Sequence, residues 1–147
     1  AIKLGGNGSL GDDAIAWKTD DEARKEVSTD VSTPAFYQGR FYIVNSDRQS
    51  VSCVEPTTGK VFWDQRLEGG DVRLQKFESS PTVADGKLYV MDHRGTVVVL
   101  QTGDEFKQLA VNPMGADNQQ NIRSTVAVAE GHLFIRTNSK LFCVGQP

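Results

Sequence analysis

The sequence predicts an all-β fold, a partial β-propeller of about three four-stranded antiparallel blades, from three observations. One segment occurs three times in related form, at residues 32–44, 79–91 and 124–136. The glycines of these segments are 47 and 45 residues apart, at Gly39, Gly86 and Gly131. Each repeat also consists of short apolar runs separated by turn residues, and a strand-built repeat of this length is typical of propeller blades.

Each repeat opens with a short strand and a tight turn. The strand follows Ser or Thr and usually Pro, which is tolerated at the first residue of a strand. Hairpin turns are predicted at residues 38–39, 85–86 and 130–131, where the second residue is a glycine that accepts a positive φ. The strand after each turn is mostly apolar on both faces, so we expect neighbouring blades to cover it on both sides.

The rest of each repeat predicts two more strands. Second turns are expected at 46–49, 92–95 and 138–140, and third strands at 50–55, 96–101 and 141–145. Fourth strands are expected at 61–67 and 105–111, after a turn that contains Thr and Gly. Four antiparallel strands in about 46 residues describe one propeller blade.

Blade boundaries and chain ends do not coincide. We expect a single partial propeller over 1–147, with blades at 31–67 and 78–111 and an incomplete last blade at 123–145. Residues 1–18 are expected to end a preceding blade, because 14–18 resembles the fourth strand around Trp63, and Trp17 precedes that residue by 46. Propellers typically have four to eight blades. The chain is therefore expected to be a fragment of a longer protein, or else to associate with copies of itself.

Composition narrows the classes of function. The 147 residues are 38% hydrophobic, enough to bury a core, and the net charge of −3 gives no basic surface for nucleic acid. No stretch approaches the roughly 20 apolar residues that cross a bilayer, and the first residues do not form a signal peptide. The two cysteines, Cys53 and Cys143, occupy the same point of different repeats, so we expect two free, buried thiols.

The motif from Cys53 to Trp63 resembles the blade motif of quinoprotein-like (PQQ-like) propellers. In that family a third strand is followed by an acidic turn, then Thr-Gly-Lys, here residues 58–60, and then a strand with Trp. The pair Trp63 and Asp64 also suggests a WD40 repeat, but there the pair precedes the glycine-bearing turn. Residues 103–112 and 131–145 look like the last two blades of the quinoprotein-like class. The resemblance implies the C-terminal portion of a secreted or periplasmic bacterial propeller.

The resemblance also implies what a catalytic member would contain. Quinone-dependent dehydrogenases hold pyrroloquinoline quinone (PQQ) between a Trp floor and a pair of adjacent cysteines, and they bind Ca²⁺ through Glu, Asn and Asp. Cys53 and Cys143 are not adjacent, and no such acidic set is recognisable. We therefore expect no catalytic, cofactor-binding or metal-binding residue in this chain; PQQ with calcium is expected only if the chain is a dehydrogenase fragment.

Cations recur at the second turn of each repeat and could form a ligand-facing rim. Arg48, Arg94 and Lys140 are each 46 residues apart. In a propeller these turns share a face with the links between blades, which carry Arg73, Lys76 and Arg123. A ring of cations could bind a carboxylate, a phosphate or an acidic peptide. Acidic residues on the same side favour instead an ordinary solvated rim; they are Asp47, Asp71, Asp92 and Asp117.

Other candidate residues favour structural roles. Trp17 and Trp63 could form a stacking surface, but a repeated Trp on a fourth strand favours packing between blades. His93 and His132 lie in different turns and are expected to be solvated rather than metal-bound. The charged link at 20–26 is expected to be a solvated loop.

The predicted function is a non-catalytic scaffold or binding module of a quinoprotein-like secreted or periplasmic protein. The alternative is the end of a PQQ-dependent alcohol or sugar dehydrogenase whose active site lies in other blades, and a sensor domain is a third possibility. Expected partners are the remaining blades of a parent protein or another copy, with a protein or small anion as a possible ligand. We expect no nucleic acid and no membrane span.

Overall fold

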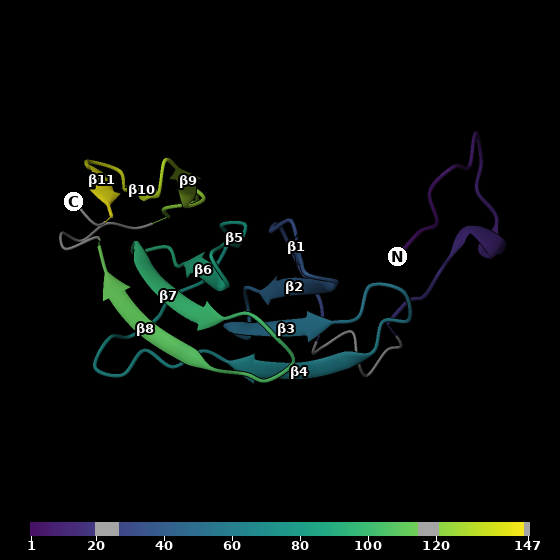
Figure 1. Ribbon diagram of the computed structural model, residues 1–147, viewed down its shortest axis with the longest axis horizontal. Coiled ribbons are helices and arrows are strands. Elements are labelled where there is room, and N and C mark those ends of the chain that lie inside the picture. Colours follow the sequence, from purple (N-terminus) through teal and green to yellow (C-terminus); the bar gives the residue numbers. More distant parts are fainter. Residues whose placement is uncertain (20–26, 115–120, 146–147) are drawn as a thin grey trace.

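The computed structural model describes residues 1–19, 27–114 and 121–145, which form three antiparallel sheets side by side (Figure 1). The first blade contains β1 (Ala35–Tyr37), β2 (Arg40–Asn45), β3 (Ser50–Val54) and β4 (Val61–Arg66). The second contains β5 (Thr82–Ala84), β6 (Lys87–Met91), β7 (Thr96–Gln101) and β8 (Gln108–Pro113). The third contains β9 (Ala127–Ala129), β10 (His132–Arg136) and β11 (Leu141–Val144). The predicted all-β fold is confirmed.

Strands follow chain order within each blade, as in a propeller. Figure 1 shows β1, β5 and β9 toward one side of the molecule, and β4 and β8 along the opposite side. Polar contacts join successive blades at their inner strands: Ser32 Oγ donates to Ser79 O at 3.1 Å, and Thr82 Oγ1 donates to Val126 O. The inner strands therefore converge, while the outer strands spread apart.

The first hairpin of every blade has the same backbone turn. Both turn residues have positive φ: 47° and 73° at Gln38 and Gly39, 49° and 66° at Asp85 and Gly86, and 47° and 70° at Glu130 and Gly131. Two successive positive φ values are those of a type I′ turn, whose twist matches the flanking strands. The three predicted hairpins are thus present, and even Gln and Glu adopt the left-handed conformation.

The main core is the seam between the first and second blades. Tyr42, Val44 and Cys53 from the first blade meet Leu88 and Val98 from the second, and all five residues are buried. The next seam repeats the arrangement between the second and third blades, with Tyr89, Met91 and Ile135. Both seams remove apolar surface from water, which is the main stabilising contribution to folding. The two-sided burial predicted for the central strands follows from this stacking.

The outer strand of the second blade begins later than predicted. β8 starts at Gln108 rather than at residue 105, because Glu105, Phe106 and Lys107 extend the turn. The ring of Phe106 leaves the strand to pack edge-on against Trp63, with 5.3 Å between ring centroids. Register shifts between Cys53 and Val54 and between Val99 and Leu100 mark the same point in both blades.

Residues 14–18 do not form the blade strand that their sequence suggests. A 3₁₀ turn, η1 (Asp12–Ala14), precedes them, and Ile15 forms a single antiparallel bridge with Ile2. This short N-terminal arm extends away from the blades (Figure 1). Among the described residues, the third blade has three strands. Within those residues, no helix is long and apolar enough to span a membrane.

The prediction of two buried thiols is wrong for one cysteine. Both thiols are free; Cys53 is fully buried in the seam, whereas Cys143 is exposed on β11. The difference arises because, among the described residues, no strand or further blade covers β11 as β4 and the second blade cover β3. Equivalent positions in a repeat thus differ in environment with what lies beside them.

Candidate functional site

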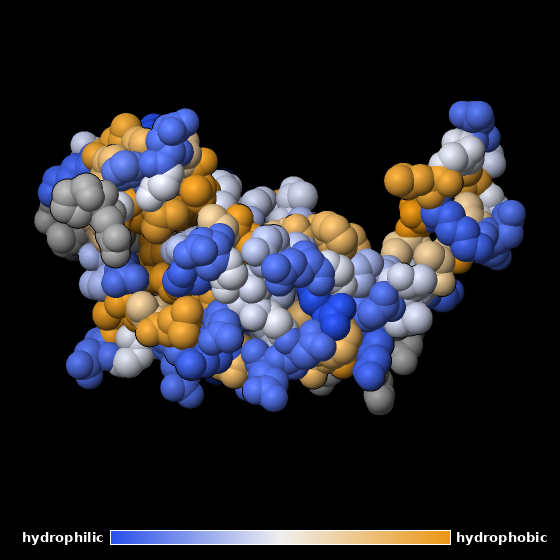
Figure 2. All heavy atoms as spheres, viewed as in Figure 1, coloured by the Kyte–Doolittle hydropathy of each residue, from blue (hydrophilic) through white to orange (hydrophobic). Residues whose placement is uncertain are grey.

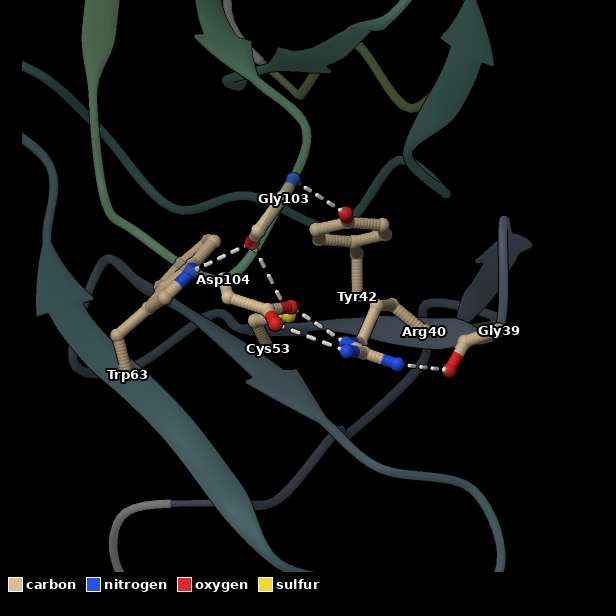
Figure 3. Close-up of polar contacts among 7 residues, drawn as sticks. All are labelled: Gly39, Arg40, Tyr42, Cys53, Trp63, Gly103 and Asp104. Carbon is tan, nitrogen blue, oxygen red and sulfur yellow. Dashed lines mark hydrogen bonds and ion pairs between the residues drawn. The ribbon is translucent and has the colours of Figure 1, made fainter.

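The seam between the first two blades carries a polar cluster, which we call the seam cluster: Arg40, Tyr42, Cys53, Trp63, Gly103 and Asp104 (Figure 3). Gly103 and Asp104 lie in the turn between β7 and β8, and the other four side chains come from the first blade. The peptide group of Gly103 is enclosed: its N–H donates to Tyr42 Oη at 2.8 Å, and its carbonyl accepts from Trp63 Nε1 at 3.0 Å. The second blade's turn is thereby held by the first blade.

Arg40 makes the charged contact of the seam cluster. Its Nε lies 2.6 Å from Asp104 Oδ1 and its Nη2 lies 2.9 Å from Oδ2, a two-pronged ion pair. The guanidinium also lies 4.2 Å from the centroid of the Phe62 ring. The hydrogen bond from Arg40 lowers the pKa of Asp104, and the reciprocal bond raises the pKa of Arg40. An open hollow of about 460 Å³ borders this pair, but both charges are already satisfied by each other.

The thiol in the seam cluster is unsuited to nucleophilic chemistry. Burial raises the pKa of Cys53 to about 11, and Sγ contacts the Gly103 carbonyl at 3.6 Å. Burial also raises the pKa of the neighbouring Tyr42 hydroxyl. A nucleophilic cysteine needs a lowered pKa, since the thiolate is the reactive form. The seam cluster therefore joins two blades and offers no activated group.

Trp17 and Trp63 make equivalent contacts one blade apart. Trp17 Nε1 donates to Pro56 O at 2.6 Å, in the turn between β3 and β4, as Trp63 Nε1 does to Gly103 in the next blade. Trp17 also packs against Gly59, where an added Cβ would lie 2.6 Å from the indole ring. Each indole thus lies on the turn of the following blade, in a packing position and not on an open stacking surface.

The second turns and the links lie together on the other face, where acids neutralise several of the predicted rim cations. Arg48 pairs with Asp64 at 3.0 Å, and Lys76 pairs with Asp47 at 2.8 Å. Arg123 pairs with Glu78. Lys140 lies in the second turn of the third blade, where its N–H donates to Thr137. Asp117 and the charged link at 20–26 lie outside the described residues.

Arg73 and Arg94 instead line two hollows that share Gln75. The larger hollow, of about 570 Å³, lies beside the end of β4 and includes Arg66, Arg73 and Glu68. The smaller, of about 140 Å³, includes Arg94 and His93. Neither Arg66 nor Arg73 has an ion-pair partner within 1–19, 27–114 and 121–145. Two guanidinium groups at one polar hollow favour an anionic ligand group such as a carboxylate.

The expectation of a solvated histidine is wrong for His93. Its side chain is 13% exposed and Nε2 lies 3.0 Å from Glu78 Oε2. Although burial opposes it, contact with His93 and Arg123 holds the pKa of Glu78 below its usual value. The backbone of His93 also bonds both neighbouring links, to Lys76 O and from Ile122 N. The residue therefore ties the second turn to the links on either side.

Sequence reasoning missed the residues that cap the second turns. Asn45 Oδ1 accepts from Arg48 N at 3.1 Å, Asp92 Oδ1 accepts from Arg94 N at 2.9 Å, and Thr137 Oγ1 accepts from Lys140 N at 3.1 Å. All three caps are buried. They are 47 and 45 residues apart, the same spacing as the repeat glycines, which could have identified them. The backbone of each recurring cation, Arg48, Arg94 or Lys140, is thus held by the cap of its own turn.

Comparison with known proteins decides the family. The family described as outer membrane protein assembly factor BamB matches residues 9–146. The chain belongs to this family of PQQ-like repeat propellers. No curated protein sequence matches it significantly. The predicted resemblance to quinoprotein-like propellers is confirmed.

A solved structure shows the same fold. Quinohemoprotein alcohol dehydrogenase from Comamonas testosteroni is similar with a TM-score of 0.58 and 19% sequence identity. The similarity covers 77% of this chain but 18% of the dehydrogenase, so the chain spans about a fifth of that protein's length. At this identity, the likeness establishes the propeller fold alone.

The BamB-family chain does not fit the quinone site that its fold class implies. Cys53 lies in a seam and Cys143 on a distant edge strand, so they cannot form an adjacent pair. Among the described residues, no three His, Cys, Asp or Glu side chains are grouped as metal ligands. The described residues thus supply neither the adjacent cysteines nor the grouped calcium ligands that the resemblance associates with PQQ.

Proposed function

We propose that this chain is part of a non-catalytic propeller that binds other proteins during assembly of the bacterial outer membrane. The observation that carries the proposal is the match over residues 9–146 to a family described as an outer membrane protein assembly factor. The seam cluster supports a scaffold role, because its polar groups are directed to one another. The family's description also supports a location on the periplasmic side of the outer membrane.

The hollow beside β4 is the surface that best supports partner binding. Arg66 and Arg73 supply two positive charges against the one negative charge of Glu68, so the lining has an excess positive charge. Three glutamines supply amides around them: Gln49, Gln65 and Gln75. An acidic peptide segment fits this chemistry, because carboxylates accept paired hydrogen bonds from guanidinium groups and backbone groups pair with amides. The proposed partner surface is therefore the face formed by the second turns and the links.

Charge reversal in the parent gene tests this proposal. We expect Arg73→Glu to reduce the amount of folded β-barrel protein in the outer membrane, measured by heat-modifiable migration on gels. Lys107→Glu makes the same charge change on an exposed residue at the opposite end of the strands. If the two variants have equal effects at equal protein levels, the proposal that the hollow around Arg73 binds a partner is wrong.

A dehydrogenase fragment remains the second candidate, because the solved structure with the same fold is a quinohemoprotein alcohol dehydrogenase. Its test is addition of PQQ and Ca²⁺ to the parent protein, because the active site of this candidate would lie in other blades. Our proposal predicts an unchanged melting temperature and no alcohol-dependent dye reduction. A quinone-dependent rise in melting temperature would favour the dehydrogenase.

A further inference from the structure

Arg94 occupies the place in the second blade that Arg48 occupies in the first, but the acid that pairs with Arg48 is not repeated there. Arg48 pairs with Asp64 of β4 at 3.0 Å. By strand register, the place of Asp64 is taken on β8 by Val111. Among the described residues, Arg94 forms no ion pair. The blade that carries Arg94 therefore does not neutralise its charge.

The two acids around the second turn of the second blade already have partners. The Asp92 carboxylate is fully buried and accepts hydrogen bonds from three backbone N–H groups. Glu78 Oε2 lies 3.0 Å from His93 Nε2, and Arg123 contacts the same oxygen. Neither carboxylate is thus left to pair with Arg94, and an anion from outside the chain would not have to displace one of them.

Arg94 lines the smaller hollow together with two side-chain amides, those of Gln75 and Asn121. Neither amide has a hydrogen bond within the part of the chain that the structure describes. The hollow measures about 140 Å³, and a water molecule takes about 30 Å³ of the liquid, so a carboxylate group fits there. A guanidinium group binds a carboxylate through two parallel hydrogen bonds, and amide NH₂ groups can donate further ones.

Both hollows border Gln75, so the groups around them form one continuous surface. The backbone N–H of Gln75 donates to Asp92 Oδ2 at 2.8 Å, which ties the link to the turn that carries Arg94. Across the two hollows three guanidinium groups outnumber one carboxylate; they belong to Arg66, Arg73, Arg94 and Glu68. Along β4 and the loop after it, the surface is mainly hydrophilic (Figure 2). This surface therefore favours a charged partner segment over an apolar one.

We propose that the two hollows form one site for an acidic partner segment with two carboxylate side chains, the first at Arg73 and the second at Arg94. The inference rests on the proposed function, because it takes an acidic peptide at the larger hollow as given. It adds that the partner carries a second acid, and that Arg94 determines specificity for it. The second contact forms within one segment and so benefits from a high effective concentration.

A double-mutant cycle in the full-length parent protein tests the second contact. The probes are capped peptides of glycine and serine with either one glutamate or two glutamates at a series of spacings. Affinities are measured by NMR titration at low ionic strength. At the best spacing, we expect the second glutamate to increase the affinity about tenfold or more. Arg94→Gln should remove this gain and leave the affinity for the one-glutamate peptide nearly unchanged.

Arg48→Gln is the matched control, because Arg48 has the same place in its turn but is paired with Asp64. It should preserve the gain from the second glutamate. The inference is wrong if Arg48→Gln and Arg94→Gln act alike, or if Arg94→Gln weakens both kinds of peptide by the same factor. It is also wrong if no spacing of two glutamates binds more tightly than one, which includes the absence of measurable binding.

Arg73→Gln separates failure of this inference from failure of the proposed function. It should weaken the one-glutamate and the two-glutamate peptides alike, since both place an acid in the larger hollow. If Arg73→Gln does so while Arg94→Gln has no effect, the larger hollow still binds an acidic segment and only the second contact is wrong. If neither variant changes the affinity, both the second contact and the acidic partner at the larger hollow are wrong.

Discussion

Arg40 of the first blade and Asp104 of the second are joined by two hydrogen-bonded contacts, of 2.6 and 2.9 Å, across the seam. The pair lies at the surface, and Asp104 is just over half exposed. It adds a directional contact to a seam whose main stabilisation comes from buried apolar side chains. Because Asp104 belongs to the turn between β7 and β8, the ion pair fixes the position of that turn on the first blade.

Asp104→Asn should lower the melting temperature at neutral pH, with a smaller effect at high salt. Arg40 lowers the pKa of Asp104, so the stabilisation is present above the unfolded pKa of about 3.9 and is lost as pH falls through the lower folded pKa. Thermal melts at several pH values should therefore show that the melting temperatures of wild type and Asp104→Asn approach each other as the pH falls. Asp85→Asn is the control, since Asp85 pairs with Lys87 inside one hairpin and joins no blades. A difference between wild type and Asp104→Asn that persisted well below the folded pKa would argue against the ion pair.

Trp63→Phe should lower the free energy of unfolding by about 1–3 kcal/mol, because an aromatic ring is kept, although a smaller one, while the hydrogen bond from the indole to Gly103 is lost. The Gly103 carbonyl then keeps only its weak contact with Cys53 Sγ. Trp17→Phe should have a smaller effect, since Trp17 is only partly buried. Urea unfolding monitored by far-UV circular dichroism measures both. The interpretation fails if Trp17→Phe is the more damaging change.

Gly86→Val should destabilise the second blade by at least about 1–2 kcal/mol. Gly86 has a φ of +66°, and the nearest atom to an added Cβ is 3.9 Å away, so the cost lies in the backbone conformation and not in a clash. Gly86→Asn is the matched control, because Asn tolerates the left-handed region. Melting temperatures should rank wild type and Asn above Val; equal values for Asn and Val would contradict the turn assignment.

A thiol reagent should distinguish the two cysteines at pH 7. Cys143 is exposed and should react within minutes, whereas Cys53 is buried with a pKa of about 11 and should react only on unfolding. Cys143→Ser should therefore abolish the fast phase, and Cys53→Ser should leave it unchanged.

Asp92→Ala should be strongly destabilising. The Asp92 carboxylate is fully buried and accepts from three backbone N–H groups, those of Gln75, Arg94 and Thr96. Their loss should lower the free energy of unfolding by roughly 3 kcal/mol or more, since each buried unpaired donor costs about 1–3 kcal/mol. Asp47→Ala, at an exposed residue of the equivalent turn, is the control, and chemical denaturation measures both.

The sequence predicts the local geometry of this chain well because each blade repeats its own short-range pattern. Gly39, Gly86 and Gly131 identified the hairpins, since only certain residues accept a positive φ. The late start of β8 was missed because Phe106 leaves the strand pattern to contact Trp63, a residue of another blade. The pattern of apolar and turn residues within one repeat does not predict contacts between blades.

The candidate site was less predictable for the same reason. Periodicity identified Arg94, and the position of a link between blades identified Arg73. Neither could show that Arg123 would be neutralised by Glu78 or that Arg66 would join Arg73 at one hollow. The exposure of Cys143 likewise depends on what lies beside β11 and not on its own segment. A repeat sequence therefore gives equivalent positions, while the environment of each position depends on its neighbours.

In the part of the chain that the structure describes, the two seams connect blades that follow one another in the sequence. Stability is then expected to be graded along the chain, as in other linear arrays with nearest-neighbour coupling. The second blade is covered on both sides, so amide protons of β6 and β7 should exchange most slowly with solvent, and those of β10 and β11 most rapidly. Unfolding of the third blade should leave the seam between the first two blades intact. Unfolding of the second blade would remove both seams.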